Sequence, residues 1–222
     1  MNTTSRFGPV TAKICGLKDA AGIDAAISGG ARYVGLNFFP PSPRAVTPIR
    51  AAELAISIPG TVKKVGLFVD PDYGLLREVL DHVALDLIQL HGGEDPERVE
   101  AIRALTGVPV LKAIKVAGAA DLDAIGKFDG VADMLLFDAK APKNLANALP
   151  GGNGLAFDWN LLAGRHWQRP WMLSGGLDTG NVAQAVTIAG ARVVDVSSGV
   201  ERAPGEKDPV AIKAFLDAVK AL

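Results

Sequence analysis

The strongest constraint on the fold is a regular alternation of short apolar segments with segments of helical periodicity, which runs from Ala12 nearly to the end of the chain. This alternation is typical of repeated βα units, in which parallel strands form a sheet that helices cover. Most apolar segments are almost continuously hydrophobic, as expected for strands buried on both faces. Eight strands are predicted, over Ala12–Leu17, Tyr33–Phe38, Lys63–Val69, Leu85–His91, Val110–Val116, Ala132–Asp138, Trp171–Leu177 and Val193–Ser198.

The segments between these strands carry apolar residues at helical spacing. Several of them begin with proline directly after a residue that can cap a helix, because proline suits the first helical position. These starts are Thr47-Pro48, Asp70-Pro71, Asp95-Pro96 and Asp208-Pro209. The predicted helices are Asp19–Ser28, Pro48–Ser57, Pro71–His82, Pro96–Leu105, Ala119–Phe128, Thr179–Ala189 and Pro209–Ala221.

Eight βα units in 222 residues predict a single (β/α)8 barrel domain over residues 1–222, since such barrels commonly occupy about 200 to 250 residues. No linker or change of composition divides the chain. Periodicity alone does not prove that the sheet closes, so an open, doubly wound sheet is the alternative. The long segment from Ala139 to Gly154, before the short helix that Asp158 opens, interrupts the rhythm and indicates a functional loop.

Composition and charge narrow the range of partners. The formal net charge of -1 and the pI near 6.3 provide no general attraction for nucleic acid or for an anionic membrane. No apolar run approaches the roughly 20 residues needed to cross a bilayer. The single cysteine cannot form an internal disulfide, and Met1–Val10 lacks the features of a signal peptide. We therefore expect a cytoplasmic protein without nucleic-acid or membrane partners. The sequence leaves open whether it is a monomer or homodimer.

Candidate catalytic residues lie at the ends of the predicted strands, where active sites of (β/α)8 barrels are found. Cys15 ends the first strand, Asp138 ends the sixth, and Asp195 lies in the eighth. A free cysteine is more often a small buried apolar residue, and a strand-end aspartate can simply cap a loop or form an ion pair. Their shared position nevertheless indicates a common site at the barrel mouth.

Glycine-rich segments follow the seventh and eighth strands. Ser174-Gly175-Gly176 and Ser197-Ser198-Gly199 stand where barrels often bind phosphate through backbone N–H groups. Gly152-Asn153-Gly154 is expected to close the same pocket. Each cluster alone could be a turn, but their coincidence at these two strand ends favours a phosphate site.

Two further strand-end residues carry polar side chains. Arg44, on the proline-rich loop after the second strand, suits recognition of a carboxylate, although an exposed and unpaired arginine is the simpler interpretation. His91 is expected to be packed or hydrogen-bonded and not catalytic. The three histidines and the cysteine have no spacing that indicates zinc, so no metal is predicted.

Taken together and in order, these motifs resemble the phosphoribosylanthranilate isomerases over nearly the whole chain from Lys13 onward. The ordered set is far more specific than any member of it. The segment from Ala139 to Pro150 is longer than expected, and Asn153 stands where threonine is expected. The motifs are Lys13-Ile14-Cys15-Gly16, Ser42-Pro43-Arg44, Gln89-Leu90-His91-Gly92, Leu136-Phe137-Asp138, Gly151 to Gly154, Phe157-Asp158-Trp159, Ser174-Gly175-Gly176-Leu177 and Asp195-Val196-Ser197-Ser198-Gly199-Val200-Glu201.

The resemblance implies a cofactor-free Amadori rearrangement of N-(5'-phosphoribosyl)anthranilate to 1-(o-carboxyphenylamino)-1-deoxyribulose 5-phosphate, a step of tryptophan biosynthesis. It implies that Cys15 is the general base and Asp138 the general acid. It further implies that Arg44 binds the substrate carboxylate. The phosphate-binding positions it implies are Gly154, Gly175, Gly176, Ser198 and Gly199.

A buried ion pair is predicted beneath this site. Lys13 lies two residues before Cys15, so the two side chains should face the same side of the first strand. Asp195 lies on the eighth strand, which is adjacent if the barrel closes. We expect Lys13 to pair with Asp195, since either charge would be unfavourable if buried alone. Asp195 could instead bind a sugar hydroxyl. A free thiol has a pKa of about 8.5, and a nearby positive charge would lower the pKa of Cys15 toward neutrality.

Three alternatives of function remain open from the residues. An isomerase of the histidine pathway performs the same kind of rearrangement with two aspartates, but Cys15 stands at the first-strand position. A metal-dependent pentose-phosphate epimerase would need histidine ligands at strand ends. A phosphate-binding barrel without catalysis would keep the glycine loops, whereas this sequence also has a candidate acid and base.

Overall fold

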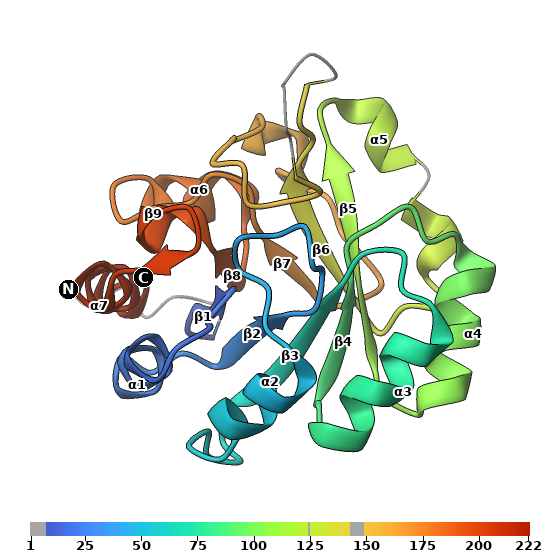
Figure 1. Ribbon diagram of the computed structural model, residues 1–222. Coiled ribbons are helices and arrows are strands. Elements are labelled where there is room, and N and C mark those ends of the chain that lie inside the picture. Colours follow the sequence, from blue (N-terminus) through green and yellow to red (C-terminus); the bar gives the residue numbers. More distant parts are fainter. Residues whose placement is uncertain (1–7, 124, 143–148) are drawn as a thin grey trace.

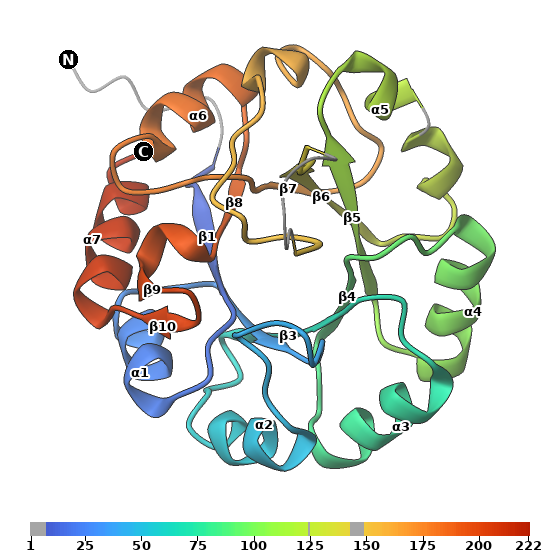
Figure 2. The same cartoon turned by 45° about the horizontal axis from the view of Figure 1, so that its top comes forward.

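The chain forms a closed barrel of eight parallel strands surrounded by helices (Figures 1 and 2). The computed structural model describes residues 8–123, 125–142 and 149–222. Each strand pairs with its neighbours in chain order, and β8 pairs with β1 to close the ring, so the open-sheet alternative is wrong. The strands are β1 (Thr11–Cys15), β2 (Tyr33–Asn37), β3 (Lys63–Phe68), β4 (Leu87–Leu90), β5 (Val110–Val116), β6 (Met134–Ala139), β7 (Trp171–Leu173) and β8 (Val193–Val196).

The helices lie on the outside of the ring, as Figure 2 shows along the barrel. They are α1 (Ala20–Ser28), α2 (Pro48–Ala55), α3 (Tyr73–His82), α4 (Pro96–Thr106), α5 (Ala119–Asp123), α6 (Val182–Ala189) and α7 (Pro209–Lys220). Short 3-10 helices occupy Ile125–Phe128, Trp159–Leu161 and Ser198–Val200. A small antiparallel hairpin, β9 (Glu201–Ala203) with β10 (Glu206–Lys207), follows β8. No helix among the described residues is long and apolar enough to span a membrane.

Two apolar cores sit on the two faces of the strands. The larger core fills the layer between the strands and the surrounding helices. The smaller core fills the barrel interior with side chains from alternating strand positions, as in other closed α/β barrels. Its buried members are Val65, Leu87, Leu111, Ala113, Met134, Leu136 and Met172. Burial on both faces explains why the strands read as continuous apolar runs.

Three of the four predicted helix starts are confirmed. The side chains of Thr47, Asp95 and Asp208 each accept a hydrogen bond from a backbone N–H of the helix that follows. The start at Asp70 is wrong, because α3 is capped by Asp72, whose side chain accepts from Leu75 N. Asp70 adopts a φ of 44°, and its carboxylate accepts from Gly93 N in the loop after β4.

Several predicted elements are too long at the ends. β7 stops at Leu173 because Gly175 and Gly176 turn the chain, with φ values of 89° and 63°. α6 starts at Val182, since the Asp178 carboxylate accepts from two backbone N–H groups and holds a turn before it. The helix expected over Ala119–Phe128 is divided between α5 and a 3-10 helix, and residue 124 lies outside the described residues. Residues 1–7 and the 143–148 part of the long loop also lie outside them.

Candidate active site

A polar pocket opens at the carboxyl ends of the barrel strands, where the sequence placed the site. Residues at the ends of β1, β2, β3, β4, β6 and β8 line it, together with the segment after β7. The part of the long loop from residue 149 onward crosses this mouth (Figure 2) and lines it as well. The pocket brings together the predicted residues Cys15, Arg44, Asp138, Gly154, Gly175, Gly176, Asp195 and Ser198.

The thiol of Cys15 lies beside the ammonium group of Lys13. Gly35 on β2 makes room for both, because a Cβ there would lie 3.0 Å from Cys15 Sγ and 3.2 Å from Lys13 Nζ. Burial raises the pKa of the Cys15 thiol, the Lys13 charge opposes this, and the Asp195 charge reinforces it. The net pKa of Cys15 lies above its ordinary value. In the protein without substrate, burial therefore outweighs the effect of the Lys13 charge on the pKa of Cys15.

The predicted pairing of Lys13 with Asp195 is confirmed. The two residues are directly opposite each other on β1 and β8, and Lys13 Nζ donates to Asp195 Oδ1 at 2.8 Å. The other carboxylate oxygen accepts from Ser174 Oγ at 3.0 Å. Burial lowers the pKa of Lys13, but Asp195 and Cys15 raise it further, so the pKa of Lys13 lies above its ordinary value. Both oxygens of Asp195 thus have protein partners, while the residue still lines the pocket.

Asp138 is buried near the end of β6 and is held through both carboxylate oxygens. Oδ1 accepts from the backbone N–H of Ala139 at 2.9 Å, and Oδ2 lies 3.0 Å from Nε2 of His91. The other ring nitrogen of His91 lies 2.8 Å from Nε2 of Gln89. His91 is hydrogen-bonded, as expected, and its partner is the candidate acid. That His91 is not itself catalytic stays a prediction.

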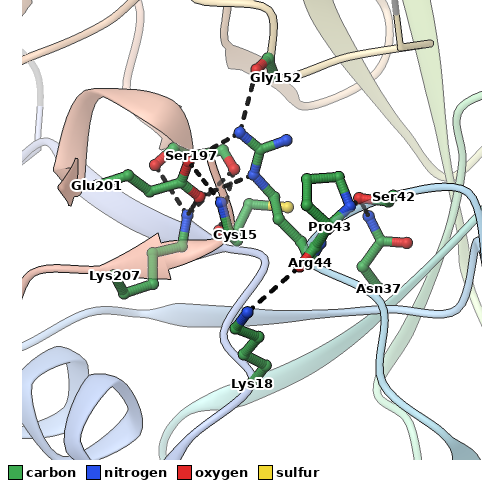
Figure 3. A network of polar contacts seen from close by, with 11 residues as sticks. Cys15, Lys18, Asn37, Ser42, Pro43, Arg44, Gly152, Ser197, Glu201 and Lys207 are labelled. Carbon is green, nitrogen blue, oxygen red and sulfur yellow. Dashed lines mark hydrogen bonds and ion pairs between the residues drawn. The ribbon is translucent and has the colours of Figure 1, made fainter. Parts of the chain in front are cut away.

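Arg44 is buried and paired, so the interpretation of an exposed, unpaired arginine is wrong. Its Nε and Nη2 donate to the two carboxylate oxygens of Glu201, each at 2.8 Å, and Nη2 also donates to the carbonyl of Gly152 (Figure 3). Lys207 Nζ donates to the same carboxylate at 2.7 Å. Burial raises the pKa of Glu201, but the hydrogen bond from Arg44 and the charge of Lys207 lower it by more. The pKa of Glu201 therefore lies below its ordinary value.

Sequence reasoning gave no role to Glu201 or Lys207. Glu201 closes the last quoted motif, and Lys207 directly precedes the Asp208 helix cap. The sequence does show two opposite charges close together after the eighth strand. It does not show that they contact Arg44, because Arg44 lies 157 positions away from Glu201 in the chain.

The glycine loops divide into residues that face the pocket and residues that pack the loops together. Gly154, Gly175, Gly176 and Ser198 line the pocket, as expected. A Cβ at Gly176 would lie 2.7 Å from the backbone carbon of Leu155. Gly199 is not among the lining residues, and a Cβ there would collide with the Leu177 carbonyl. The Asn153 side chain closes the long loop by bonding to both backbone groups of Leu149.

Within the described residues, no group of three or more histidine, cysteine, aspartate or glutamate side chains could hold a metal ion. The geometry therefore offers a thiol, a carboxylate, an arginine and glycine-rich backbone in one pocket. These groups suit acid–base chemistry on an anionic substrate.

Comparison with known proteins identifies the family. Residues 12–218 match the model of the N-(5'phosphoribosyl)anthranilate (PRA) isomerase family. The chain belongs to this family. An N-(5'-phosphoribosyl)anthranilate isomerase of Rhodospirillum centenum is 62% identical over 96% of this chain and 100% of its own length.

Solved structures of phosphoribosyl anthranilate isomerases share the fold. The crystal structure of the protein from Thermotoga maritima superposes with a TM-score of 0.85 at 33% identity, covering 96% of this chain and all of that chain. A second one, in complex with reduced 1-(o-carboxyphenylamino)-1-deoxyribulose 5-phosphate, has a TM-score of 0.81 at 32% identity over the same shares. The expected (β/α)8 barrel and the expected family are both confirmed.

Proposed function

We propose that this member of the PRA isomerase family converts N-(5'-phosphoribosyl)anthranilate to 1-(o-carboxyphenylamino)-1-deoxyribulose 5-phosphate without a cofactor, using Cys15 as general base and Asp138 as general acid. The observation that carries the proposal is the meeting of these two side chains in one pocket, with Arg44 and the glycine loops around them. The family relationship supplies the reaction, and the geometry supplies the candidate groups.

In the first step, Asp138 delivers a proton to the oxygen of the furanose ring, and the C1–O bond breaks. This leaves a protonated Schiff base between C1 and the anthranilate nitrogen. The adjacent C2 proton becomes acidic, and the Cys15 thiolate removes it to give an enolamine. The enolamine gains a proton at C1 and loses one from the C2 hydroxyl. The isomerisation has no net gain or loss of protons, so one acid and one base can be restored within the site.

The cationic intermediate also accounts for a base whose pKa is raised before substrate binds. Burial holds the pKa of Cys15 above its ordinary value, and the charge of Lys13 compensates only in part. A Schiff-base cation formed beside the thiol favours the thiolate at the step that needs it. The thiolate is therefore most populated at the step in which the C2 proton becomes acidic.

Recognition of the two substrate ends is assigned to separate parts of the pocket. Arg44 receives the anthranilate carboxylate, because a guanidinium is suited to that group. The backbone around Gly154, Gly176 and Ser198 receives the phosphate. Asp195 is assigned mainly to pairing with Lys13, because both of its oxygens already accept hydrogen bonds.

A steady-state assay of the purified protein with N-(5'-phosphoribosyl)anthranilate tests the proposal. Product should form, and exhaustive treatment with EDTA should leave the rate unchanged. Tight binding without turnover would instead support a binding barrel. Loss of activity with EDTA that a divalent ion restores would support a metal-dependent enzyme.

A further inference from the structure

Arg44 is the first of a row of three buried charges, and the proposed function gives no role to the other two, Glu201 and Lys207. Figure 3 shows Glu201 between Arg44 and Lys207. The side chains of the three residues are 6%, 4% and 0% exposed, in the order Arg44, Glu201, Lys207. Buried ions are unfavourable unless they are paired. An odd number of charges leaves one positive charge without a partner in the row.

Lys207 must be an ammonium ion, because three acceptors surround its nitrogen. Nζ donates to Glu201 Oε1 at 2.7 Å, to the Ser197 carbonyl at 2.8 Å and to Ser197 Oγ at 3.2 Å. The Ser197 hydroxyl gives its own hydrogen to the Cys15 carbonyl, so its oxygen can only accept from Lys207. A neutral amine would have too few hydrogens for these contacts. All three donors are used, and Lys207 has none left for a ligand.

Hydrogen bonds hold the Arg44 guanidinium along one edge only. Its Nε and Nη2 donate to the Glu201 carboxylate, and Nη2 also donates to the Gly152 carbonyl. Within the described part of the chain, Nη1 has no hydrogen-bond acceptor. The pocket is lined by Arg44 together with Gly152, and a Cβ on Gly152 would lie 2.8 Å from Nη1. Nη1 is therefore the guanidinium nitrogen left for a ligand, and the close glycine keeps the approach to it narrow.

We propose that Glu201 and Lys207 are specificity-determining positioning residues, which fix the Arg44 guanidinium and hold the row at a net charge of +1 for a single ligand carboxylate. Without Lys207, Glu201 would neutralise Arg44 and remove the attraction for an anion. Without Glu201, the guanidinium would keep its charge but lose its fixed direction. This inference rests on the proposed binding of the substrate carboxylate by Arg44.

The ionisation of the row agrees with this assignment. The pKa of Glu201 lies below its ordinary value, since its contacts with Arg44 and Lys207 outweigh burial. Burial lowers the pKa of Lys207 below its ordinary value, and the charge of Glu201 opposes this change only in part. The carboxylate and the ammonium group therefore depend on each other, and loss of one changes the charge of the row.

Binding of two matched ligands to four proteins tests the inference. The ligands are a reduced, non-reacting analogue of the product and the same molecule without its carboxyl group, measured by titration calorimetry. The row carries a net charge of +1 in the unchanged chain and of 0 in Lys207→Met. It carries +2 in Glu201→Gln and +1 in the double variant. Lys213→Met, which removes a charge from an exposed pair on α7, is the matched control.

Affinity for the carboxylated ligand should follow the charge of the row. Lys207→Met should weaken it about tenfold or more, since it removes a unit charge from a buried row, where charges are poorly screened. The double variant should recover most of that loss. Binding of the ligand without a carboxyl group should change little in any variant. Glu201→Gln should bind the carboxylated ligand at least as tightly, but discriminate less against an analogue with the carboxyl group at the meta position.

The outcomes separate this inference from the assignment of Arg44. If Arg44→Ala leaves the preference for the carboxylated ligand intact, the assignment of Arg44 is wrong. If Arg44→Ala abolishes the preference but Lys207→Met and its rescue have no effect, only the charge row is wrong. Should Lys207→Met fail to fold, the comparison of Glu201→Gln with the double variant still decides, because their rows also differ by one charge.

Discussion

Nε2 of His91 lies 3.0 Å from Oδ2 of Asp138, and both side chains are buried at the end of the barrel. The imidazole is held from its other side by Gln89, and the carboxylate is held by the backbone of Ala139. The Gln89 carboxamide can present its N–H or, after rotation, its oxygen to the ring, so it can support either tautomer of His91. We therefore regard His91 as a positioning residue for the candidate acid.

Replacement of His91 by alanine should lower kcat about tenfold or more while KM changes less, because Asp138 loses the side chain that orients it. Steady-state kinetics and circular dichroism would measure the rate and the fold. His82→Ala is the matched control, since His82 is exposed on α3. A His91→Ala protein with kcat within twofold of the unchanged chain would reduce His91 to a packing residue.

Gly151 covers the same pair and allows an independent test. A Cβ at this position would lie 2.6 Å from His91 Nε2 and 2.9 Å from Asp138 Oδ2. Gly151 is not among the residues with positive φ, so alanine introduces the contact without backbone strain. Gly151→Ala should therefore lower kcat, whereas Gly60→Ala should not, because a Cβ at Gly60 meets nothing within 4 Å. Equal activities of the two variants would show that the loop moves away from Asp138 in the working enzyme.

Cys15→Ala and Asp138→Asn should each lower turnover by roughly 100-fold or more, as expected for loss of a group that transfers a proton. Thermal unfolding should show that both proteins remain folded. The double variant should be little slower than the slower single variant, since acid and base act in one sequence of steps. Turnover close to that of the unchanged chain in either single variant would remove that residue from its assigned role.

The ionisation of Cys15 can be followed directly because the chain has one cysteine. Iodoacetamide alkylates the thiolate, so the alkylation rate rises with pH through the pKa. The alkylation rate should rise at a higher pH than it does for an ordinary thiol, since burial raises the pKa of Cys15. Lys13→Met should move the rise to higher pH, and Asp195→Asn should move it to lower pH, because Lys13 lowers and Asp195 raises the pKa of Cys15.

Both variants should also unfold at lower temperature, since each breaks a buried ion pair. Shifts of the alkylation curve in the same direction for both variants would contradict the assigned charges. Lys213→Met should leave the alkylation curve unchanged, because Lys213 forms an exposed ion pair on α7.

The barrel and the positions of its site residues were predictable because strand ends follow from the apolar pattern. Cys15 and Asp138 were placed at strand ends by that pattern, and the Lys13 pair followed from closure of the ring. The helix start at Asp70 was not predictable, because Asp72 lies two residues later and can cap equally well. The local sequence does not show whether Asp70 or Asp72 will accept a hydrogen bond from Gly93 N, because Gly93 lies in the loop after β4.

The electrostatic details of the site required the structure. The partner of Arg44 comes from the hairpin after β8, and the partner of Asp138 is the residue that directly follows β4. Neither pairing leaves a periodic signal in the chain. The direction of the Cys15 pKa depends on the balance of burial against Lys13, which is a property of packing and not of composition.

The glycine loops give a final prediction, which separates glycines that face a ligand from glycines that pack loops together. A Cβ at Gly154 would have Ser198 Oγ at 3.7 Å as its nearest neighbour, whereas one at Gly176 would lie 2.7 Å from the backbone of Leu155. Both glycines have positive φ, at 69° and 63°, so alanine would strain the backbone at each by about 1 to 2 kcal/mol. Gly176→Ala adds a collision with backbone, so its melting temperature should fall further than that of Gly154→Ala.

Inhibition by inorganic phosphate, measured beside thermal unfolding, then shows whether these positions belong to a phosphate site. Both variants should bind phosphate more weakly, because the backbone N–H groups around them change direction. Gly107→Ala is the matched control, since Gly107 has a φ of 65° with open space around it and lies at the end of α4, away from the pocket. It should lose stability without losing phosphate inhibition. If Gly154→Ala and Gly176→Ala behave like this control, the loops serve packing, and the phosphate must bind elsewhere in the pocket.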